Sequence, residues 1–321
     1  TALVHDLDHG RFADMYAQTL VYGLFVARYS DPTPETFTKD EARALVPKTN
    51  PFLLSFFDHI VGPSFDERLA RAVDELCEVF RISDVRELVQ RHLHGAKPRT
   101  DRDPIIHFYE DFLQAYDEDL RVAMGAYYTP LPVVRYMVRQ VDALLRDEFH
   151  ISKGIANSST IKFKVDDGQA RRFKDPVTRR WKTVVGQELV LHKVQILDPA
   201  VGTATFLNEI IEFIHAGFST QQGRWASYVN EDLVPRLNGF EFMMAPYTIA
   251  HLKLGMTLEN SGVTGLNDRL RVYLTNTLEE GIKHQPDLFT FGLADAVTEE
   301  SREAGIIKSA HPVMVIIGNP P

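Results

Sequence analysis

Two short, mostly apolar segments, each followed by residues that end a strand, constrain this chain more than any other feature. Residues 194–197 (VQIL) lead into the loop 198–207 (DPAVGTATFL), and residues 312–317 (PVMVII) lead into Gly318-Asn319-Pro320-Pro321. Apolar runs of this length predict buried strands. Small residues after a strand let the backbone approach a ligand, and a following helix offers free N–H groups. The sequence therefore predicts a ligand site where the two strands end.

The C-terminal part of the chain alternates between strand-like and helix-like segments. The expected strands are 194–197, 238–241, 270–274 and 312–317. The expected helices between them are 204–216, 222–235 and 245–258. This alternation is typical of an α/β fold with a doubly wound sheet. Residues 281–311 contain Gly, Pro and mixed charges, and they are expected to form a long connection.

The N-terminal part, residues 1–120, is predicted to be an all-α helical domain. Apolar residues at helical spacing place helices at 12–28, 39–46, 65–81, 83–94 and 104–120. The pattern changes at residues 124–132 (MGAYYTPLP), where Thr129 is expected to cap a helix over 133–149 that has Pro130 in its first turn. The second domain is therefore expected to span residues 121–321.

A basic insertion is expected within that second domain, at about residues 153–193. It carries ten Lys and Arg against four Asp and Glu, whereas the rest of the chain carries 25 and 40. Strands at 160–165 and 181–185, with a turn at Asp167-Gly168, predict a hairpin. Two interpretations stay open: a solvated hairpin, or a flap that contacts the phosphates of a nucleic acid. The net charge of −9 argues against a whole chain built to coat DNA.

The composition argues against several other classes of protein and site. No apolar stretch approaches the roughly 20 residues that cross a bilayer, and no charged-then-apolar leader is present, so a cytoplasmic location is expected. The single cysteine, Cys77, excludes an internal disulfide and a cysteine zinc cluster. Residues 5–9 (HDLDH) have no second cluster of ligands, so no metal site is expected there.

Three motifs resemble those of one enzyme family. A dinucleotide loop would read Gly-x-Gly-x-x-Gly, but the loop 198–207 has only Gly202. It is instead similar to Asp-Pro-Ala-x-Gly-x-Gly-x-Phe-Leu of the amino-DNA methyltransferases, with Ala204 in place of the second glycine. Asn319-Pro320-Pro321 resembles the start of their catalytic motif Asn-Pro-Pro-Tyr/Phe. Residues 125–130 (GAYYTP) resemble the element that precedes the cofactor loop in γ-class N6-adenine enzymes and in type I modification subunits.

The resemblance covers residues 120–321 approximately, with the motifs in the family's order. It implies a Rossmann-like sheet that uses S-adenosylmethionine to methylate adenine N6 in double-stranded DNA. Residues 17–27 also resemble the helical coupler of large single-chain (type ISP-like) restriction–modification enzymes. In those proteins a nuclease and a helicase-like motor lie upstream and a target-recognition domain lies downstream, so this chain is expected to be a middle part of such a polypeptide.

The resemblance also assigns roles to individual residues. The positions that it assigns to S-adenosylmethionine are Tyr128, Thr129, Pro130, Asp198, Pro199, Ala200, Gly202, Phe206, Glu241, Phe242, Asn276, Thr277 and Leu278. The first three would line the methionine end, and the loop from Asp198 would wrap the amino-acid moiety. Glu241 would bind the ribose hydroxyls, and Asn276 the adenine amino group. Glu241 as an acid favoured at a helix start, and Asn276 as a turn residue, stay open as readings without a ligand.

Asn319 carries the expected chemistry, with Pro320 and Pro321 as the other catalytic positions. An exocyclic amine is a poor nucleophile because its lone pair is delocalised into the ring. The Asn319 side-chain oxygen and the Pro320 carbonyl would accept hydrogen bonds from the two amine hydrogens and free the lone pair. The target base must leave the duplex. The aromatic that would stack on it follows Pro321 in the family, so this chain is expected to bind the cofactor but to need that aromatic for transfer.

Two other functions stay open. Asn-Pro-Pro also serves in enzymes that methylate RNA or a protein glutamine. A non-catalytic module that couples a DNA motor to a recognition domain would also retain a cofactor site.

Overall fold

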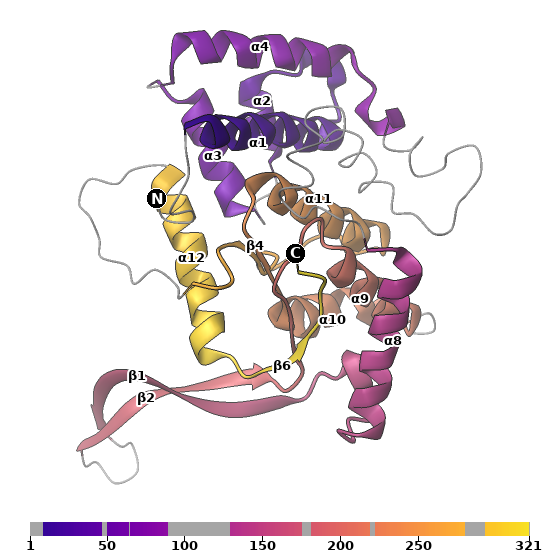
Figure 1. The fold of residues 1–321 in the computed structure, drawn as a ribbon, viewed down its shortest axis with the longest axis vertical. Coiled ribbons are helices and arrows are strands. Elements are labelled where there is room, and N and C mark those ends of the chain that lie inside the picture. The colour runs from indigo at the N-terminus through magenta and orange to yellow at the C-terminus, as the bar shows by residue number, and fades with distance from the viewer. Residues whose placement is uncertain are drawn as a thin grey trace.

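The computed structural model describes residues 9–46, 50–63, 65–88, 129–174, 181–218, 222–279 and 293–320. Helices of the N-terminal part lie at one end of the molecule in Figure 1, and a long hairpin projects from the other end. The helix expected at 104–120, most of the one expected at 83–94, the charged residues 5–8, Tyr128 and Pro321 lie outside the described residues.

The N-terminal part consists of helices, as expected. They are α1 (His9–Ser30), α2 (Lys39–Leu45), α3 (Pro51–Val61) and α4 (Glu67–Ile82). The sequence did not predict α3. Its buried residues are Phe52, Leu53, Phe56, Phe57 and Ile60. These residues follow helical spacing, and Asp58 and His59 lie exposed on the other side, so the two-faced pattern of α3 was present in the sequence although it was not predicted.

A parallel sheet of four strands forms the centre of the α/β part. The strands are β3 (Gln195–Asp198), β4 (Leu237–Glu241), β5 (Val272–Leu274) and β6 (Val313–Ile316). All four lie where the sequence predicted strands. Their order is β5-β4-β3-β6, so the chain moves outward from β3 to β5 and then crosses back to the other side of β3. The strand order therefore reverses between β3 and β6.

Helices cover both faces of this sheet. On one face, α8 (Leu131–Asp147), α9 (Thr205–Ala216) and α11 (Met244–Asn260) share a core with Ile196, Leu237 and Val272. On the other face, α12 (Leu293–Ala310) packs Ala304 and Ile307 against Leu197, Phe240 and Tyr273. Alternate residues of each strand thus face opposite layers.

One expectation for this part needs correction, and a second is confirmed with irregular geometry. Residues 281–311 were expected to form a connection, but 293–310 are helix α12, whose narrow apolar stripe is interrupted by charged residues. The helix expected at 222–235 is present as a continuous helical stretch made of short segments: 3₁₀ turns at both ends, α10 (Trp225–Tyr228) and a π turn. Pro235, which cannot donate a backbone hydrogen bond, lies in the last of them. The short 3₁₀ or π turns are η1 (Pro34–Thr36), η2 (Gly154–Ala156), η3 (Gln222–Arg224), η4 (Val229–Leu233) and η5 (Val234–Arg236).

The N-terminal helices pack on α11. Phe25 and Val26 of α1 form a cluster with Leu252 and Met256 of α11. Nearly every side chain of α11 is buried, because the sheet covers one side and α1 the other. The two parts are therefore joined by an apolar interface. Among the described residues, no helix is both long enough and apolar enough to span a membrane.

The basic insertion is a two-stranded antiparallel ribbon, β1 (Thr160–Lys174) and β2 (Trp181–His192) (Figure 1). The hairpin was expected, but the turn at Asp167-Gly168 was wrong. The pairing register shifts between Val165 and Ala170, so the strand is irregular there and continues. The connection between the two strands, residues 175–180, lies outside the described residues.

Thr129 does not cap α8, which also corrects an expectation. The N-cap position is Pro130, and it makes no side-chain capping bond. Pro132 occupies the first turn of the helix instead, where its missing N–H leaves no bond unmade. The Thr129 hydroxyl is therefore available for another contact.

Candidate functional site

The carboxyl ends of β3 and β6 meet side by side. Leu197 pairs with Ile316, and the N–H of Ile317 donates to the carbonyl of Leu197 at 3.0 Å. Just beyond this pair, Asp198 and Gly318 lie close together: a Cβ on Gly318 would lie 2.5 Å from Asp198 Oδ1. Only glycine leaves room for this carboxyl group. In open α/β sheets ligands bind beyond the carboxyl ends of strands where the strand order reverses, and this is such a place.

Asp198 is almost fully buried at that point. Its Oδ1 accepts a hydrogen bond from the N–H of Ala200 at 3.1 Å, while its Oδ2 is buried without a hydrogen-bond partner in the described part of the chain. Burial raises the pKa of Asp198 to about 7, and the charge of Glu241 adds to this, whereas the Ala200 N–H opposes it. A buried carboxylate oxygen without a partner is unusual in folded proteins. It marks a position suited to a cationic or hydrogen-bond-donating group.

The loop after Asp198 folds back over β4. The N–H of Val201 donates to the Phe240 carbonyl at 2.9 Å, and a Cβ on Gly239 would lie 2.3 Å from Val201 Cγ2. Gly202 and Ala204 both have positive φ, 54° and 63°. The left-handed conformation is costly for alanine and free for glycine. A glycine, as in the motif that this loop resembles, would adopt this conformation at the position of Ala204 without that cost.

Glu241 ties this loop to the start of α11. Its Oε2 accepts from the N–H of Gly202 at 2.8 Å, and its Oε1 accepts from Phe242 and Met243, both at 2.8 Å. Burial raises the pKa of Glu241 to about 7, even though these three N–H groups lower it. The contacts next to α11 fit the reading of an acid at a helix start. A carboxylate offers about four acceptor positions, so one remains for a ligand.

The residues after β5 border the same region as the loop after Asp198 and the side chain of Glu241. The Thr277 hydroxyl donates to the Pro199 carbonyl at 2.5 Å, which joins this loop to the loop after Asp198. The Asn276 side chain is engaged locally: its Oδ1 accepts from the N–H of Leu278 at 3.1 Å and its Nδ2 donates to Glu279 Oε1 at 2.9 Å. This is the contact pattern of a turn residue, with one Oδ1 lone pair left over.

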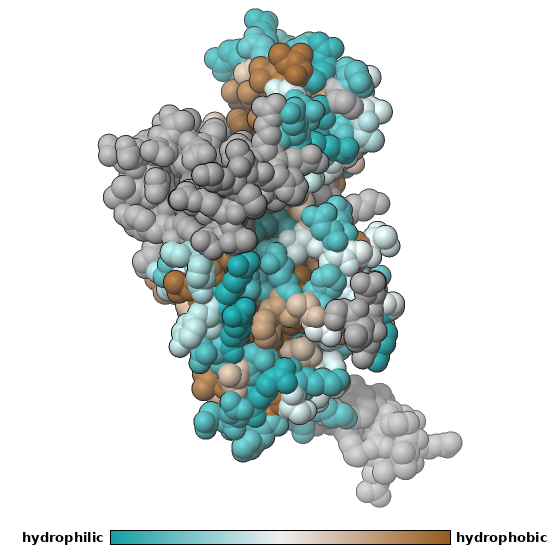
Figure 2. All heavy atoms as spheres, turned by 90° about the vertical axis from the view of Figure 1, so that its right-hand side faces the viewer, coloured by the Kyte–Doolittle hydropathy of each residue, from teal (hydrophilic) through white to brown (hydrophobic). Residues whose placement is uncertain are grey.

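The aromatic and apolar positions assigned to the site differ in exposure. Phe206 is buried in the core around α9. Phe242 is 38% exposed and Leu278 is 95% exposed. Phe242 and Leu278 are therefore accessible to a ligand. Phe206 instead belongs to the same core cluster as Val201 and Ala204 of the loop. On the face that includes α8, apolar side chains lie in separate patches among hydrophilic ones (Figure 2).

Asn319 lies at the end of β6 with its side chain exposed. Its Nδ2 donates to the hydroxyl of Thr129 at 3.1 Å, although the two residues are 190 positions apart. Pro320 is exposed next to it. The structure thus brings together Thr129, Asp198, Glu241 and Asn319 through direct contacts or shared loops. Tyr128 and Pro321 are outside the described residues, so their assigned roles stay predictions.

One residue of this region was not predicted as part of the site. Lys308 of α12 donates to three oxygens of the loop that contains Asn276. It lies in the stretch that the sequence indicated as a connection, so nothing singled it out. A helical reading of 293–310 would have placed Lys308 one turn after Ala304, on the face that packs against the sheet.

Comparison with known proteins finds likeness at the level of structure alone. No protein-family model matches the chain, and no curated protein does. Several solved structures match the chain. A cryo-EM structure of a DrdV–DNA complex matches with a TM-score of 0.56 and 24% identity, over 100% of this chain and 25% of that one.

Two type ISP restriction–modification enzymes match as well, each at 18% identity and over 100% of this chain. A nuclease-deletion mutant of LlaGI in complex with a DNA substrate mimic has a TM-score of 0.54, with 21% of that chain covered. ATP-dependent LlaBIII bound to DNA has a TM-score of 0.57, with 17% of that chain covered. The chain therefore has the fold of a segment that makes up a quarter or less of these much longer chains.

Proposed function

We propose that this chain is the methyltransferase core of a restriction–modification enzyme, and that it transfers a methyl group from S-adenosylmethionine to the N6 amine of adenine in DNA. One observation carries the proposal: the loop of Asp198 and the side chain of Asn319 lie at adjacent strand ends, and Asn319 bonds to Thr129. The order β5-β4-β3-β6 corresponds to strands 3-2-1-4 of a Rossmann-like sheet, in which ligands occupy this edge.

The residues present fit S-adenosylmethionine. The unpartnered Oδ2 of Asp198 suits the ammonium of the methionine moiety. The remaining acceptor position of Glu241 suits a ribose hydroxyl, and the remaining lone pair of Asn276 Oδ1 suits the adenine amino group. Around Gly202, no described atom lies within 4 Å of where a Cβ would be, so a ligand has room. When bound, the cofactor would supply an electrophilic methyl group on its sulfonium.

The chain's own contribution is to hold and activate the amine. The Asn319 Nδ2 is engaged by Thr129, which leaves Oδ1 to accept one amine hydrogen, and the Pro320 carbonyl would accept the other. These acceptors favour a tetrahedral nitrogen whose lone pair is available for attack. Positioned acceptors act without a strong base, because the neutral amine would attack the methyl carbon with its lone pair while the carbon–sulfur bond breaks. The methylated nitrogen would release its extra proton to water only afterwards.

DNA is the substrate that the neighbouring features favour. Lys162 and Lys164 lie exposed on the same side of β1, close to the body of the protein, and offer charge to phosphates. All three similar structures are complexes with DNA or a DNA mimic. Because this chain spans a quarter or less of them, we propose that an upstream nuclease and motor and a downstream target-recognition domain belong to the same polypeptide.

Cofactor titration and a transfer assay test the proposal. Calorimetry of the chain with S-adenosylhomocysteine should give saturable binding that Asp198→Ala abolishes. Methyl transfer should be measured with a chain extended past Pro321, on adenine-containing duplex, with Asn319→Ala as the inactive variant. Transfer to RNA or to a glutamine peptide, but not to duplex DNA, would exclude the proposed substrate.

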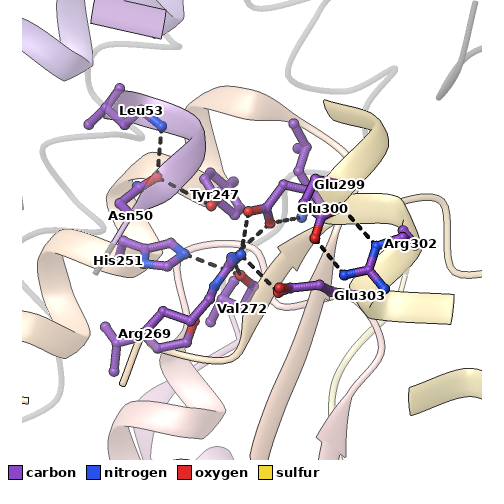
Figure 3. Close-up of polar contacts among 12 residues, drawn as sticks. Asn50, Leu53, Tyr247, His251, Arg269, Val272, Glu299, Glu300, Arg302 and Glu303 are labelled. Carbon is purple, nitrogen blue, oxygen red and sulfur yellow. Dashed lines mark hydrogen bonds and ion pairs between the residues drawn. The ribbon is translucent and has the colours of Figure 1, made fainter. Parts of the chain in front are cut away.

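A non-catalytic coupling module is the second candidate, because α1 and α3 are joined closely to α11. The Tyr247 hydroxyl of α11 donates to Asn50 Oδ1 at 3.2 Å across this interface (Figure 3). This candidate predicts cofactor binding without transfer, even when the aromatic that follows Asn-Pro-Pro in the family is present.

A further inference from the structure

Lys308 of α12 holds the loop that follows β5. Its Nζ donates to Thr275 Oγ1 at 3.0 Å, to the Asn276 carbonyl at 2.6 Å and to the Glu279 carbonyl at 2.9 Å. The same ammonium lies 5.2 Å from the centre of the Phe240 ring. A lysine has three donors, and all three of Lys308 form hydrogen bonds to residues 275–279.

This arrangement is specific to the loop. Lys308 is partly buried, and burial lowers the pKa of its ammonium. A partly buried charge is tolerated where it is fully hydrogen-bonded. Each of the three acceptors belongs to the loop, so the position of the loop and the charge of Lys308 stabilise each other.

Other contacts fix the remaining sides of the loop. The N–H of Thr275 donates to the Glu241 carbonyl at 2.7 Å, and the Thr277 hydroxyl donates to Pro199. At the start of the loop, the N–H of Leu274 donates to Glu300 Oε2 at 3.1 Å. Glu300 belongs to α12 and is paired with Arg269 at 2.7 Å (Figure 3). Helix α12 therefore holds the loop at two places. Glu300 bonds to Leu274 just before it, and Lys308 bonds to residues within it.

We propose that Lys308 is a positioning residue that sets the loop 275–279 against the nucleobase of the cofactor and thereby determines selectivity for adenine. This rests on the proposed function, in which Asn276 faces the adenine amino group. Lys308 binds the carbonyl of Asn276, and the planar trans peptide that follows is therefore held in one orientation. Without Lys308, the turn that carries Asn276 would lose its fixed position relative to the nucleobase, and the preference for one purine edge would fall.

The test compares two ligands on four proteins. Affinities for S-adenosylhomocysteine and S-inosylhomocysteine, which carries a carbonyl in place of the adenine amino group, should be measured by calorimetry. The proteins are the unmodified chain, Lys308→Met, Lys308→Arg and Arg302→Gln. Arg302 is a matched control, since it is on the same helix and bonds to Glu299 at the surface.

We expect Lys308→Met to lose about tenfold in affinity for the adenosyl ligand and much less for the inosyl ligand, so that selectivity falls. Lys308→Arg should restore part of the selectivity, and Arg302→Gln should match the unmodified chain. Equal losses for both ligands, or none, would overturn the inference. Failure of the unmodified chain to bind either ligand would instead overturn the proposed function, and the inference with it.

Hydrogen exchange without ligand gives an independent readout. In Lys308→Met the amides of residues 275–279 should exchange faster, while those of β3 and β4 keep their protection. Unchanged exchange in the loop would show that Lys308 does not hold it. If Lys308→Met fails to fold, Lys308→Gln gives the same comparison with a polar side chain of similar length.

Discussion

The side-chain amide of Asn319 donates to the hydroxyl of Thr129 at 3.1 Å, which links the end of β6 to the residue before α8. The contact has a chemical consequence, because an amide has one donating and one accepting end. With Nδ2 held by Thr129, Oδ1 is left for another partner. In the proposed reaction that partner is the target amine, so Thr129 would determine which end of Asn319 the substrate meets.

Replacement of Thr129 by valine tests this link. Valine has nearly the same shape but accepts no hydrogen bond, so the Asn319 amide would be free to turn. We expect about a tenfold lower rate of methyl transfer by the extended chain, the equivalent of about 1.4 kcal/mol. Thr129→Ser keeps the hydroxyl and should remain within about twofold of the unmodified rate. An unchanged rate in Thr129→Val would show that the contact does not orient Asn319.

Gly318→Ala should disturb the site through Asp198. The new methyl carbon would lie 2.5 Å from Asp198 Oδ1, too close for any real contact, so the carboxyl group or the strand must move. We expect a loss of about 1–3 kcal/mol in the free energy of unfolding and loss of S-adenosylhomocysteine binding, measured by urea titration and calorimetry. Gly265→Ala is the control, because no described atom lies within 4 Å of its added methyl. Equal behaviour of the two variants would contradict the contact.

Much of the fold could be predicted because its elements have regular patterns. The strands β3 and β6 are short apolar runs bounded by Gly, Pro and Asp, and α8 has apolar residues at helical spacing. Helix α3 has apolar residues at helical spacing and an exposed side with Asp58 and His59, so its pattern was present in the sequence although it was not predicted. Helix α12 has a narrow apolar stripe among charges, so it lacks a clear two-faced pattern. For α12, packing against the sheet decides the helix more than any local pattern does.

The sequence could predict where the site residues lie along the chain, but not which atoms they contact. The motifs placed Asp198, Glu241 and Asn319 at strand ends. That Glu241 bonds to Gly202 and that Gly318 faces Asp198 depend on atoms far apart in sequence. The contacts of Asn276 are local and match the turn residue that the sequence left open. Lys308 is the clearest case, since its three acceptors lie 29 to 33 residues away.

Asn50→Ala should weaken the interface between the two parts of the chain. Asn50 caps α3 by accepting from the N–H of Leu53 at 2.9 Å, and the same oxygen accepts from the Tyr247 hydroxyl. The variant loses a cap and leaves a buried hydroxyl without this acceptor, which together cost about 1–3 kcal/mol in urea unfolding. Thr38→Ala removes the exposed cap of α2 and should cost about 1 kcal/mol or less. Equal losses would mean that the bond to Tyr247 contributes nothing.

The stability of the unliganded protein should depend on pH through Asp198 and Glu241. Burial raises both pKa values to about 7 in the folded state, whereas they are about 4 in an unfolded chain. The folded state therefore holds protons that the unfolded state releases between these values. The contribution of these groups is full below about pH 4 and is lost as the pH rises to about 7, by a few kcal/mol for each group. Asp198→Asn stays neutral at all pH values, so the difference in unfolding free energy between the variant and the unmodified chain isolates the effect. That difference, from urea titrations between pH 5 and 8, should shift in favour of the variant as the pH rises, and a constant difference would contradict the raised pKa of Asp198.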